Sequence, residues 1–220
     1  MRALAVVMVL AASADARPIP QGGGWLHYEL AGVHAVDDDA PTAPRELVLA
    51  GARLHGIIGG RYLAYHVGLD LAAGATIRGG GFAYDVSLFP FGAALRLGAS
   101  GVLAVGLGIG ASGATGTLDD AFTVPVDVTL EVGGGAVRLL ARGRGTLVYN
   151  SATRQGGAPT LGGFDELDAM VGLRVGKHER AYGFSSSTGY FVGASYRELL
   201  DTRMVGLVIG YAIAGGTVRR

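Results

Sequence analysis

The chain of 220 residues contains no cysteine, one lysine and seven prolines. The absence of cysteine excludes disulfide scaffolds, thiolate zinc sites and cysteine nucleophiles. Charged residues make up 16% of the chain, against about 25% in ordinary soluble domains. The formal net charge is zero, which argues against a nucleic-acid-binding protein because such proteins usually carry a basic surface. After the first residues no uninterrupted apolar run reaches about 18 residues, so a helical membrane protein is not expected.

Glycine is abundant instead, at 39 residues, and half of the chain is apolar. The glycines follow no G-X-Y period, which excludes collagen. The apolar fraction excludes a highly charged, disordered chain. The length suits one domain.

The first residues have the pattern of a secretory signal. Arg2 is followed by the apolar run Ala3–Ala12 and by small-x-small cleavage patterns ending at Ala14 and Ala16. We therefore predict a signal peptide over 1–16 and a single β-barrel domain over 17–220. A buried N-terminal strand or helix is the alternative.

From Gly24 onwards apolar residues recur with a period of two, which indicates β-strands with one apolar face. The runs predict ten strands, at 25–34, 46–56, 61–71, 82–97, 102–111, 122–132, 136–149, 167–176, 190–197 and 205–213. The phase changes within 82–97, where Leu88 and Leu95 can share a face only if one extra residue is inserted. We therefore predict a β-bulge at Pro90–Gly92, with a full turn as the alternative.

Long and short connections alternate for most of the chain. Long links are predicted at 37–45, 72–81, 112–121 and 150–165, and short ones at 59–60, 98–101 and 133–135. A long link at 177–189 interrupts this order. Such asymmetry is typical of up-and-down barrels with short turns at one end and longer loops at the other.

The composition of the second strand face indicates which face meets water. A soluble barrel would show a charged exterior, yet this face is mostly small residues with isolated charges of both signs. Small and oppositely charged residues suit a narrow, filled lumen. Charges enclosed there must pair, because an unpaired buried charge costs several kcal/mol. The predicted lumen ion-pair network comprises Glu29, Arg53, Asp70, Asp85, Arg96, Asp127, Glu131, Arg138, Arg142, Asp168, Arg174 and Arg197. Arg144 lies on the same face of its strand.

The apolar face is then expected to meet lipid. Leu207, Ile209 and Val171 should point outwards, whereas Arg142 and Arg174 should point inwards. Aromatic residues near the ends of the runs suggest interfacial girdles, although cross-strand aromatic packing would give the same pattern. These aromatics are Tyr28, Phe82, Tyr84, Phe122, Tyr149, Tyr190, Tyr196 and Tyr211.

With its signal-like Met1–Ala16, alternating segments such as Val205–Ile213 and asymmetric links, the chain resembles the small bacterial outer-membrane β-barrel proteins. The resemblance implies an all-β, up-and-down antiparallel transmembrane barrel of about ten strands, within a range of about 8–12. It also implies an outer-membrane location reached by signal-directed export. The implied partners are outer-membrane lipid and the barrel-assembly machinery.

Local motifs give weaker signals. The glycines of Gly108–Gly113 match a dinucleotide-binding string, but no helix is predicted after them, so we interpret them as small lumen residues. Asp37–Asp39 lacks the spacing of an EF-hand and is interpreted as a solvated loop. His27, His55 and His66 share one face, so a metal site is geometrically possible, but hydrogen-bonded lumen histidines are the simpler interpretation. No cofactor and no metal ligand set is predicted.

The expected function is that of a barrel with a narrow, polar, side-chain-filled lumen that acts as a structural element, a surface-display scaffold or a small-solute conduit. A wide porin is not expected, because water-filled channels have roughly 16–18 strands. One alternative is a soluble secreted or periplasmic barrel that binds an apolar ligand. The other is a rim enzyme acting on lipid, with Ser185, Ser186, Ser187 or Ser195 beside His178 and Glu179. No nucleophile elbow supports that enzyme, so no catalytic residue is assigned.

Overall fold

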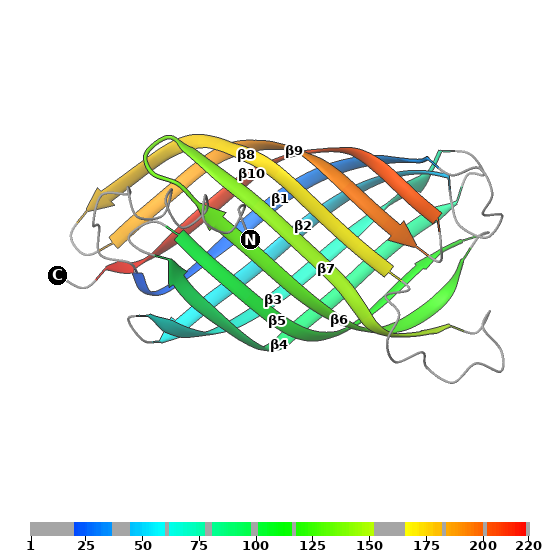
Figure 1. Cartoon of the computed structure of the whole chain (residues 1–220), viewed down its shortest axis with the longest axis horizontal. Coiled ribbons are helices and arrows are strands. Elements are labelled where there is room, and N and C mark those ends of the chain that lie inside the picture. The colour runs from blue at the N-terminus through cyan, green and yellow to red at the C-terminus, as the bar shows by residue number, and fades with distance from the viewer. Residues whose placement is uncertain are drawn as a thin grey trace, which may run out of the picture.

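The computed structural model describes residues 20–36, 45–59, 62–77, 81–97, 101–115, 118–151, 166–181, 184–199 and 202–218. These residues form ten strands in one closed, antiparallel barrel, and β1 pairs with β10 to close it. The strands are β1 (Pro20–Ala35), β2 (Glu46–Gly59), β3 (Leu63–Thr76), β4 (Phe82–Leu97), β5 (Gly101–Ala114), β6 (Leu118–Val132), β7 (Val137–Ser151), β8 (Glu166–Ala181), β9 (Phe184–Leu199) and β10 (Thr202–Val218). Figure 1 shows them inclined to the long axis of the barrel.

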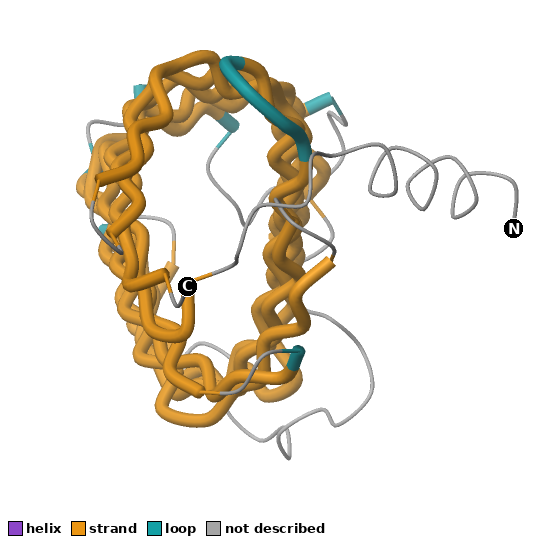
Figure 2. Tube along the Cα trace, turned by 90° about the vertical axis from the view of Figure 1, so that its left-hand side faces the viewer, coloured by secondary structure: helices purple, strands orange, loops and turns teal. Residues whose placement is uncertain are grey.

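The predicted fold class and all ten predicted strands are confirmed, but the strands are longer than the sequence pattern indicated. Viewed from the end, the strands form a closed and flattened ring (Figure 2). Within the described part of the chain, no helix has the length and apolarity needed to cross a membrane. The predicted signal segment and Asp37–Asp39 lie outside the described residues.

The predicted bulge in β4 is present. Leu88 pairs with Ile109 and Phe91 pairs with Leu107, so β4 contains one residue more than β5 over this interval. The strand continues through Pro90 without a turn. Because the extra residue reverses the phase, Leu88 and Leu95 both point outwards while Phe89 and Arg96 are buried.

A second bulge was not predicted, and it corrects the placement of Tyr149. Val124 pairs with Val148 and Pro125 pairs with Thr146, which leaves Leu147 as an extra residue in β7. Pro125 has no backbone N–H to donate to the ladder, which suits an irregularity at this point. The phase of β7 reverses after Leu147, so Tyr149 is buried inside the barrel instead of joining an outer girdle.

Several predicted links are strand in the structure. Half of 72–81 belongs to β3 and most of 112–121 belongs to β5 and β6, and the link predicted at 177–189 shrinks to the two residues between Ala181 and Phe184. The serines at 185–187, expected in a loop, therefore lie in β9. All four connections at one barrel end contain only two to four residues, and we call it the short-turn end. Short connections also occur at the other end, from Ala114 to Leu118 and from Leu199 to Thr202. The opposite end, which we call the long-link end, holds the two longest connections, from Ala35 to Glu46 and from Ser151 to Glu166.

The interior is not uniformly polar, because three buried apolar clusters line it. One lies at the long-link end and contains Val33, Leu47, Leu49, Tyr149, Leu199 and Met204 among its members. A second lies at the short-turn end and contains Trp25, Ile57, Ala64, Ala94 and Ala104. The third, on β7–β10, contains Leu140, Met170, Phe191, Val208 and Ala212.

Candidate functional site in the barrel interior

Charged side chains fill the barrel between its apolar ends, and they form three groups of ion pairs. The central group is built on Arg53 of β2. Its guanidinium lies 3.4 Å from Glu29 of β1, 3.0 Å from Asp70 of β3 and 3.5 Å from Asp127 of β6. Arg142 of β7 donates to the other oxygen of Glu29 at 2.5 Å. Arg53 and Asp70 face one another because their positions pair directly in the β2–β3 register.

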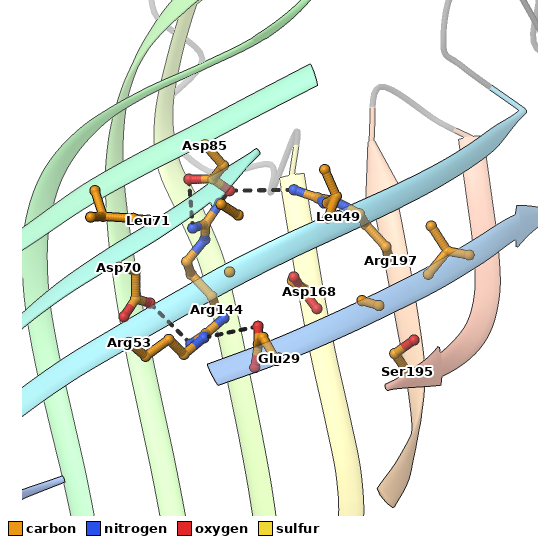
Figure 3. A pocket seen from close by; sticks show the side chains of 14 residues that line it. Glu29, Leu49, Arg53, Asp70, Leu71, Asp85, Arg144, Asp168, Ser195 and Arg197 are labelled. Atoms are coloured by element: carbon orange, nitrogen blue, oxygen red, sulfur yellow. Dashed lines mark hydrogen bonds and ion pairs between the residues drawn. The ribbon is translucent and has the colours of Figure 1, made fainter. Parts of the chain in front are cut away.

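The second group lies closer to the long-link end and contains two carboxylates and two guanidiniums. Arg144 of β7 donates to Asp85 of β4 and, at 3.0 Å, to Glu166 of β8. Arg197 of β9 approaches the same two carboxylates, at 3.3 Å from Asp85 and 2.8 Å from Glu166. Figure 3 shows Asp85 between Arg144 and Arg197, with the Arg53 pairs beside them. The charges of this group balance.

The third group lies towards the short-turn end. Glu131 of β6 accepts from Arg138 at 2.9 Å and from Arg174 at 2.8 Å through the same carboxylate oxygen. Arg174 also donates to the hydroxyl of Ser187 at 2.6 Å. Arg174 is only 2% exposed. Because each arginine comes from a different strand, Glu131 joins β6, β7 and β8.

Three of these bridges cross the lumen. Glu29 on β1 reaches Arg142 on β7, Arg53 on β2 reaches Asp127 on β6, and Asp85 on β4 reaches Arg197 on β9. Strands β4 and β9 are five positions apart in the ten-strand ring, so they lie on opposite sides of it. The bridging side chains therefore act as struts through the middle of the barrel.

Ten of the twelve predicted network residues take part in these pairs, and two do not. Arg96 is buried, and its Nε and Nη2 atoms have no hydrogen-bond partner among the described residues. Asp168 pairs in register with Arg144 and Arg197 and lines a cavity beside them, but the structure gives it no ion pair within the described part of the chain.

Two network residues were not predicted as members. Arg144 was placed on the correct strand face, and its alternation with Arg142 is the signal that could have included it. Glu166 adjoins the expected link 150–165, one residue before the predicted strand, so the alternation did not reach it. The structure begins β8 at Glu166, whose side chain is 1% exposed.

Two small cavities lie between these groups. A cavity of about 40 Å³ lies among Glu29, Arg53, Asp70, Asp85, Asp168 and Arg197, and a second of about 20 Å³ lies beside Tyr149 and Leu199. A cavity needs about 10–15 Å³ to hold one buried water. These two cavities therefore have room for water molecules and not for an organic ligand.

Two of the three predicted lumen histidines contact one another. Nδ1 of His55 lies 2.9 Å from Nε2 of His66, and Nε2 of His55 lies 2.7 Å from Asp70. His27 is also buried, but it lies against Phe191 and neither of its ring nitrogens has a hydrogen-bond partner among the described residues. No cluster of three or more His, Cys, Asp or Glu positioned for a metal ion occurs among the residues that the structure describes.

The other motifs lie in regular strands. The glycines from Gly108 to Gly113 belong to β5, and Cβ atoms at Gly106 and Gly108 would meet the ring of Phe89. Of the residues considered for a rim enzyme, Ser187 accepts from Arg174, and Nδ1 of His178 lies 3.5 Å from Arg138. Ser195 is buried on the inner face of β9.

The outer face is apolar over a band bounded by charges. Leu207, Ile209 and Val171 are 66%, 53% and 57% exposed, as predicted. On β10 this band runs from Val205 to Ile213 and is preceded by the exposed Arg203. On β8 it ends where the exposed Lys177 follows Val175. Arg203 and Lys177 lie at opposite ends of the barrel.

The predicted aromatic girdle is present only in part. Tyr28, Phe82, Phe122 and Tyr190 are exposed on the outer face. Tyr28, Tyr211 and Tyr190 are direct register partners across β1, β10 and β9. Tyr84 donates to the exposed Asp120 near the long-link end. The row of three tyrosines lies within the strands and not at their ends, so it also fits cross-strand aromatic packing.

Comparisons with known proteins add little to this description. No family model matches the sequence, and no curated protein matches it. Among solved structures, the crystal structure of the beta domain of the Bordetella autotransporter BrkA is similar with 12% identity over 90% of this chain and 99% of that chain, at a TM-score of 0.38. A likeness at this level carries no functional conclusion, so the description of this chain as a closed, ten-stranded antiparallel barrel rests on its own strand pairing.

Proposed function

We propose that this chain is an integral outer-membrane β-barrel with an interior closed by its own side chains, and that it serves as a structural or surface-display element. One observation carries the proposal: the polarity of a soluble protein is reversed. Leu207 is 66% exposed while Arg174 is 2% exposed in the same sheet. In water this arrangement would expose a continuous apolar surface to the solvent, which is unfavourable. In a bilayer the same surface meets acyl chains.

The dimensions of the apolar band support this proposal. The nine residues from Val205 to Ile213 extend about 26 Å along the strand at about 3.3 Å per residue. A strand tilt of about 40° reduces this to roughly 20 Å along the barrel axis. Outer-membrane barrels carry an apolar band of about 25 Å. Arg203 and Lys177 would then lie in the two interfaces.

The lumen struts favour a closed barrel over a diffusion pore. The bridges from Glu29 to Arg142 and from Asp85 to Arg197 cross the space through which a solute would have to pass. Barrels of about eight strands have just enough interior for their own side chains, whereas porins with open channels have roughly 16–18 strands. A barrel of ten strands belongs near the lower limit.

Membrane fractionation tests the location. After expression with the predicted signal segment 1–16, the protein should stay in the outer-membrane pellet through a high-salt wash and dissolve only in detergent. A Leu207→Arg variant should lose most of this membrane-inserted fraction, because Leu207 faces lipid within the apolar band, where arginine costs up to about 2–4 kcal/mol at the midplane. The matched variant Thr217→Arg, outside the apolar band on the same strand, should retain it, since the cost near an interface is about 0–1 kcal/mol. Release of the unmodified protein into buffer would instead support a soluble barrel.

Conductance in a planar bilayer tests the closed interior. The purified protein should give no steps of the size that wide porins give, because ion pairs that cross the lumen occupy it. Steady, large steps would contradict the closed lumen and restore the role of a solute conduit.

A further inference from the structure

The short-turn end of the lumen contains a stack of three aromatic rings that the proposed function does not use. The rings of His55 and His66 lie with their centroids 5.1 Å apart, and Trp25 stacks on both, at 5.3 Å and 5.6 Å. Both histidines are buried, at 2% and 0% exposure.

Two glycines make room for this stack on the barrel wall. A Cβ at Gly68 would lie 2.7 Å from Nδ1 of His55, and a Cβ at Gly92 would lie 2.8 Å from Nδ1 of His66. Side chains at these positions would displace the rings. The rings of His55 and His66 therefore lie between Trp25 on one side and Gly68 and Gly92 on the other.

The hydrogen bonds of the two rings form a chain with an acceptor at each end. Nε2 of His55 lies 2.7 Å from Oδ1 of Asp70, and Nδ1 of His66 lies 3.2 Å from the carbonyl oxygen of Val105. The inner nitrogens, Nδ1 of His55 and Nε2 of His66, lie 2.9 Å apart. Arg53 lies 3.0 Å from the other oxygen of Asp70, which favours the ionised carboxylate.

Counting hydrogens gives the charge of the pair. An ionised carboxylate and a carbonyl oxygen only accept, so each outer nitrogen must carry a hydrogen. The bond between the inner nitrogens needs a third. Two neutral imidazoles carry only two ring N–H groups in total, so all three bonds form only when one ring is an imidazolium.

The central ion group beside the histidine pair contains one more negative charge than positive charges. The central ion group contains the carboxylates of Glu29 on β1, Asp70 on β3 and Asp127 on β6 against the guanidiniums of Arg53 on β2 and Arg142 on β7. Its formal sum is therefore −1. Arg144 on β7 also acts electrostatically on Asp70 but is already paired in the second ion group. The uncharged ring of Phe89 on β4 also lies beside the stack, with its centroid 6.1 Å from the centroid of the His55 ring.

We propose that His55 and His66 together hold one proton, shared along the chain from Asp70 to Val105, as the missing positive charge of the central ion group. The indole of Trp25 supports this charge, because a cation within about 6 Å of a tryptophan face is attracted by it. A second proton would place two N–H groups face to face between the inner nitrogens, so the pair holds one and not two.

The test is the number of hydrogens on the ring nitrogens, read by ¹⁵N NMR of the full-length barrel with ¹⁵N-labelled histidine in detergent micelles at pH 7. We expect three protonated nitrogens among the four of His55 and His66, with one N–H signal shifted strongly downfield. His66→Phe keeps a ring in the stack and removes the shared bond. His55 should then be neutral, protonated at Nε2 alone.

A second variant keeps the proposal testable if His66→Phe does not fold. Asp70→Asn removes the charged acceptor, so the count should fall from three protonated nitrogens to two. His34→Gln, at the exposed long-link rim, is the control and should leave the count at three. Two protonated nitrogens in the unmodified protein, or an unchanged pattern of His55 in His66→Phe, would overturn the proposal. The result does not depend on the membrane location, because the same spectra can be recorded if the protein dissolves in buffer.

Discussion

At the scale of single residues, the recurring feature of the lumen is a carboxylate that is shared by two arginines. Glu29, Glu131 and Glu166 each lie between two guanidiniums that come from different strands. A buried ion pair adds little net stability, because desolvation of the charges opposes their attraction. Removing one partner is different, because it leaves an uncompensated charge inside the barrel.

Glu166→Gln should therefore be strongly destabilising. Arg144 and Arg197 would keep only Asp85 between them, and the expected loss is about 3–5 kcal/mol in the free energy of unfolding. Urea unfolding in lipid vesicles measures this loss, with fluorescence of Trp25, the single tryptophan of the chain, as the probe. Asp120→Asn is the control, since this exposed carboxylate accepts a hydrogen bond from Tyr84 and forms no ion pair among the described residues, so its loss should stay within about 0.5 kcal/mol. Equal effects of the two substitutions would contradict the role assigned to Glu166.

At the scale of strands, glycines on the inner face make space for large side chains of the neighbouring strand. Phe89 of β4 is 0% exposed and lies over Gly106 of β5. A Cβ added at Gly106 would lie 3.2 Å from Cβ and Cδ1 of Phe89, which is closer than ordinary packing allows. At most inner glycines an added Cβ would also meet backbone atoms, but at Gly106 it would meet only side-chain atoms of Phe89. A smaller residue at position 89 can therefore relieve this contact.

Gly106→Ala should lower the free energy of unfolding by about 1–3 kcal/mol, the usual cost of overpacking a core. Combining it with Phe89→Leu should recover part of that loss, because the smaller side chain leaves room for the added methyl group. Gly143→Ala on β7 is a suitable control, because a Cβ there meets nothing within 4 Å. A double-mutant cycle by urea unfolding measures the coupling. Strict additivity of Gly106→Ala and Phe89→Leu would argue against the contact.

Bulges decide the phase of a strand, and they differ in how visible they are in the sequence. The bulge in β4 could be predicted because Pro90 and the change of apolar phase mark it. The bulge at Leu147 in β7 could not, because Leu147 and Tyr149 continue an apparently regular alternation. Its cause lies on the neighbouring strand, where Pro125 faces it without an N–H.

At the scale of the whole molecule, the absence of cysteine allows single-cysteine labelling to map the outer surface in cells. With the long-link end facing the exterior, Arg203→Cys should react with a membrane-impermeant maleimide on intact cells. Lys177→Cys should react only after the outer membrane is permeabilised. Leu207→Cys should resist the reagent in both cases, because it would lie in the hydrocarbon region. Reaction of Leu207→Cys on intact cells would place the apolar band in water.

The sequence by itself determined the number of strands, the face to which most side chains point and the composition of each face. These follow from a period of two, because successive side chains of a strand alternate between its two faces. Local alternation also placed Arg53, Asp70 and Glu131 inside the barrel without any knowledge of their partners.

Only the tertiary structure decided which charges meet across the lumen, as Asp85 does with Arg197, and which carboxylate serves two arginines. It also extended the strands into expected links, turned Tyr149 inwards and left Arg96 outside the ion pairs. The physical reason is that pairing across a ring depends on barrel closure, register and bulges. These are properties of strands far apart in the chain, and the pattern within one strand does not contain them.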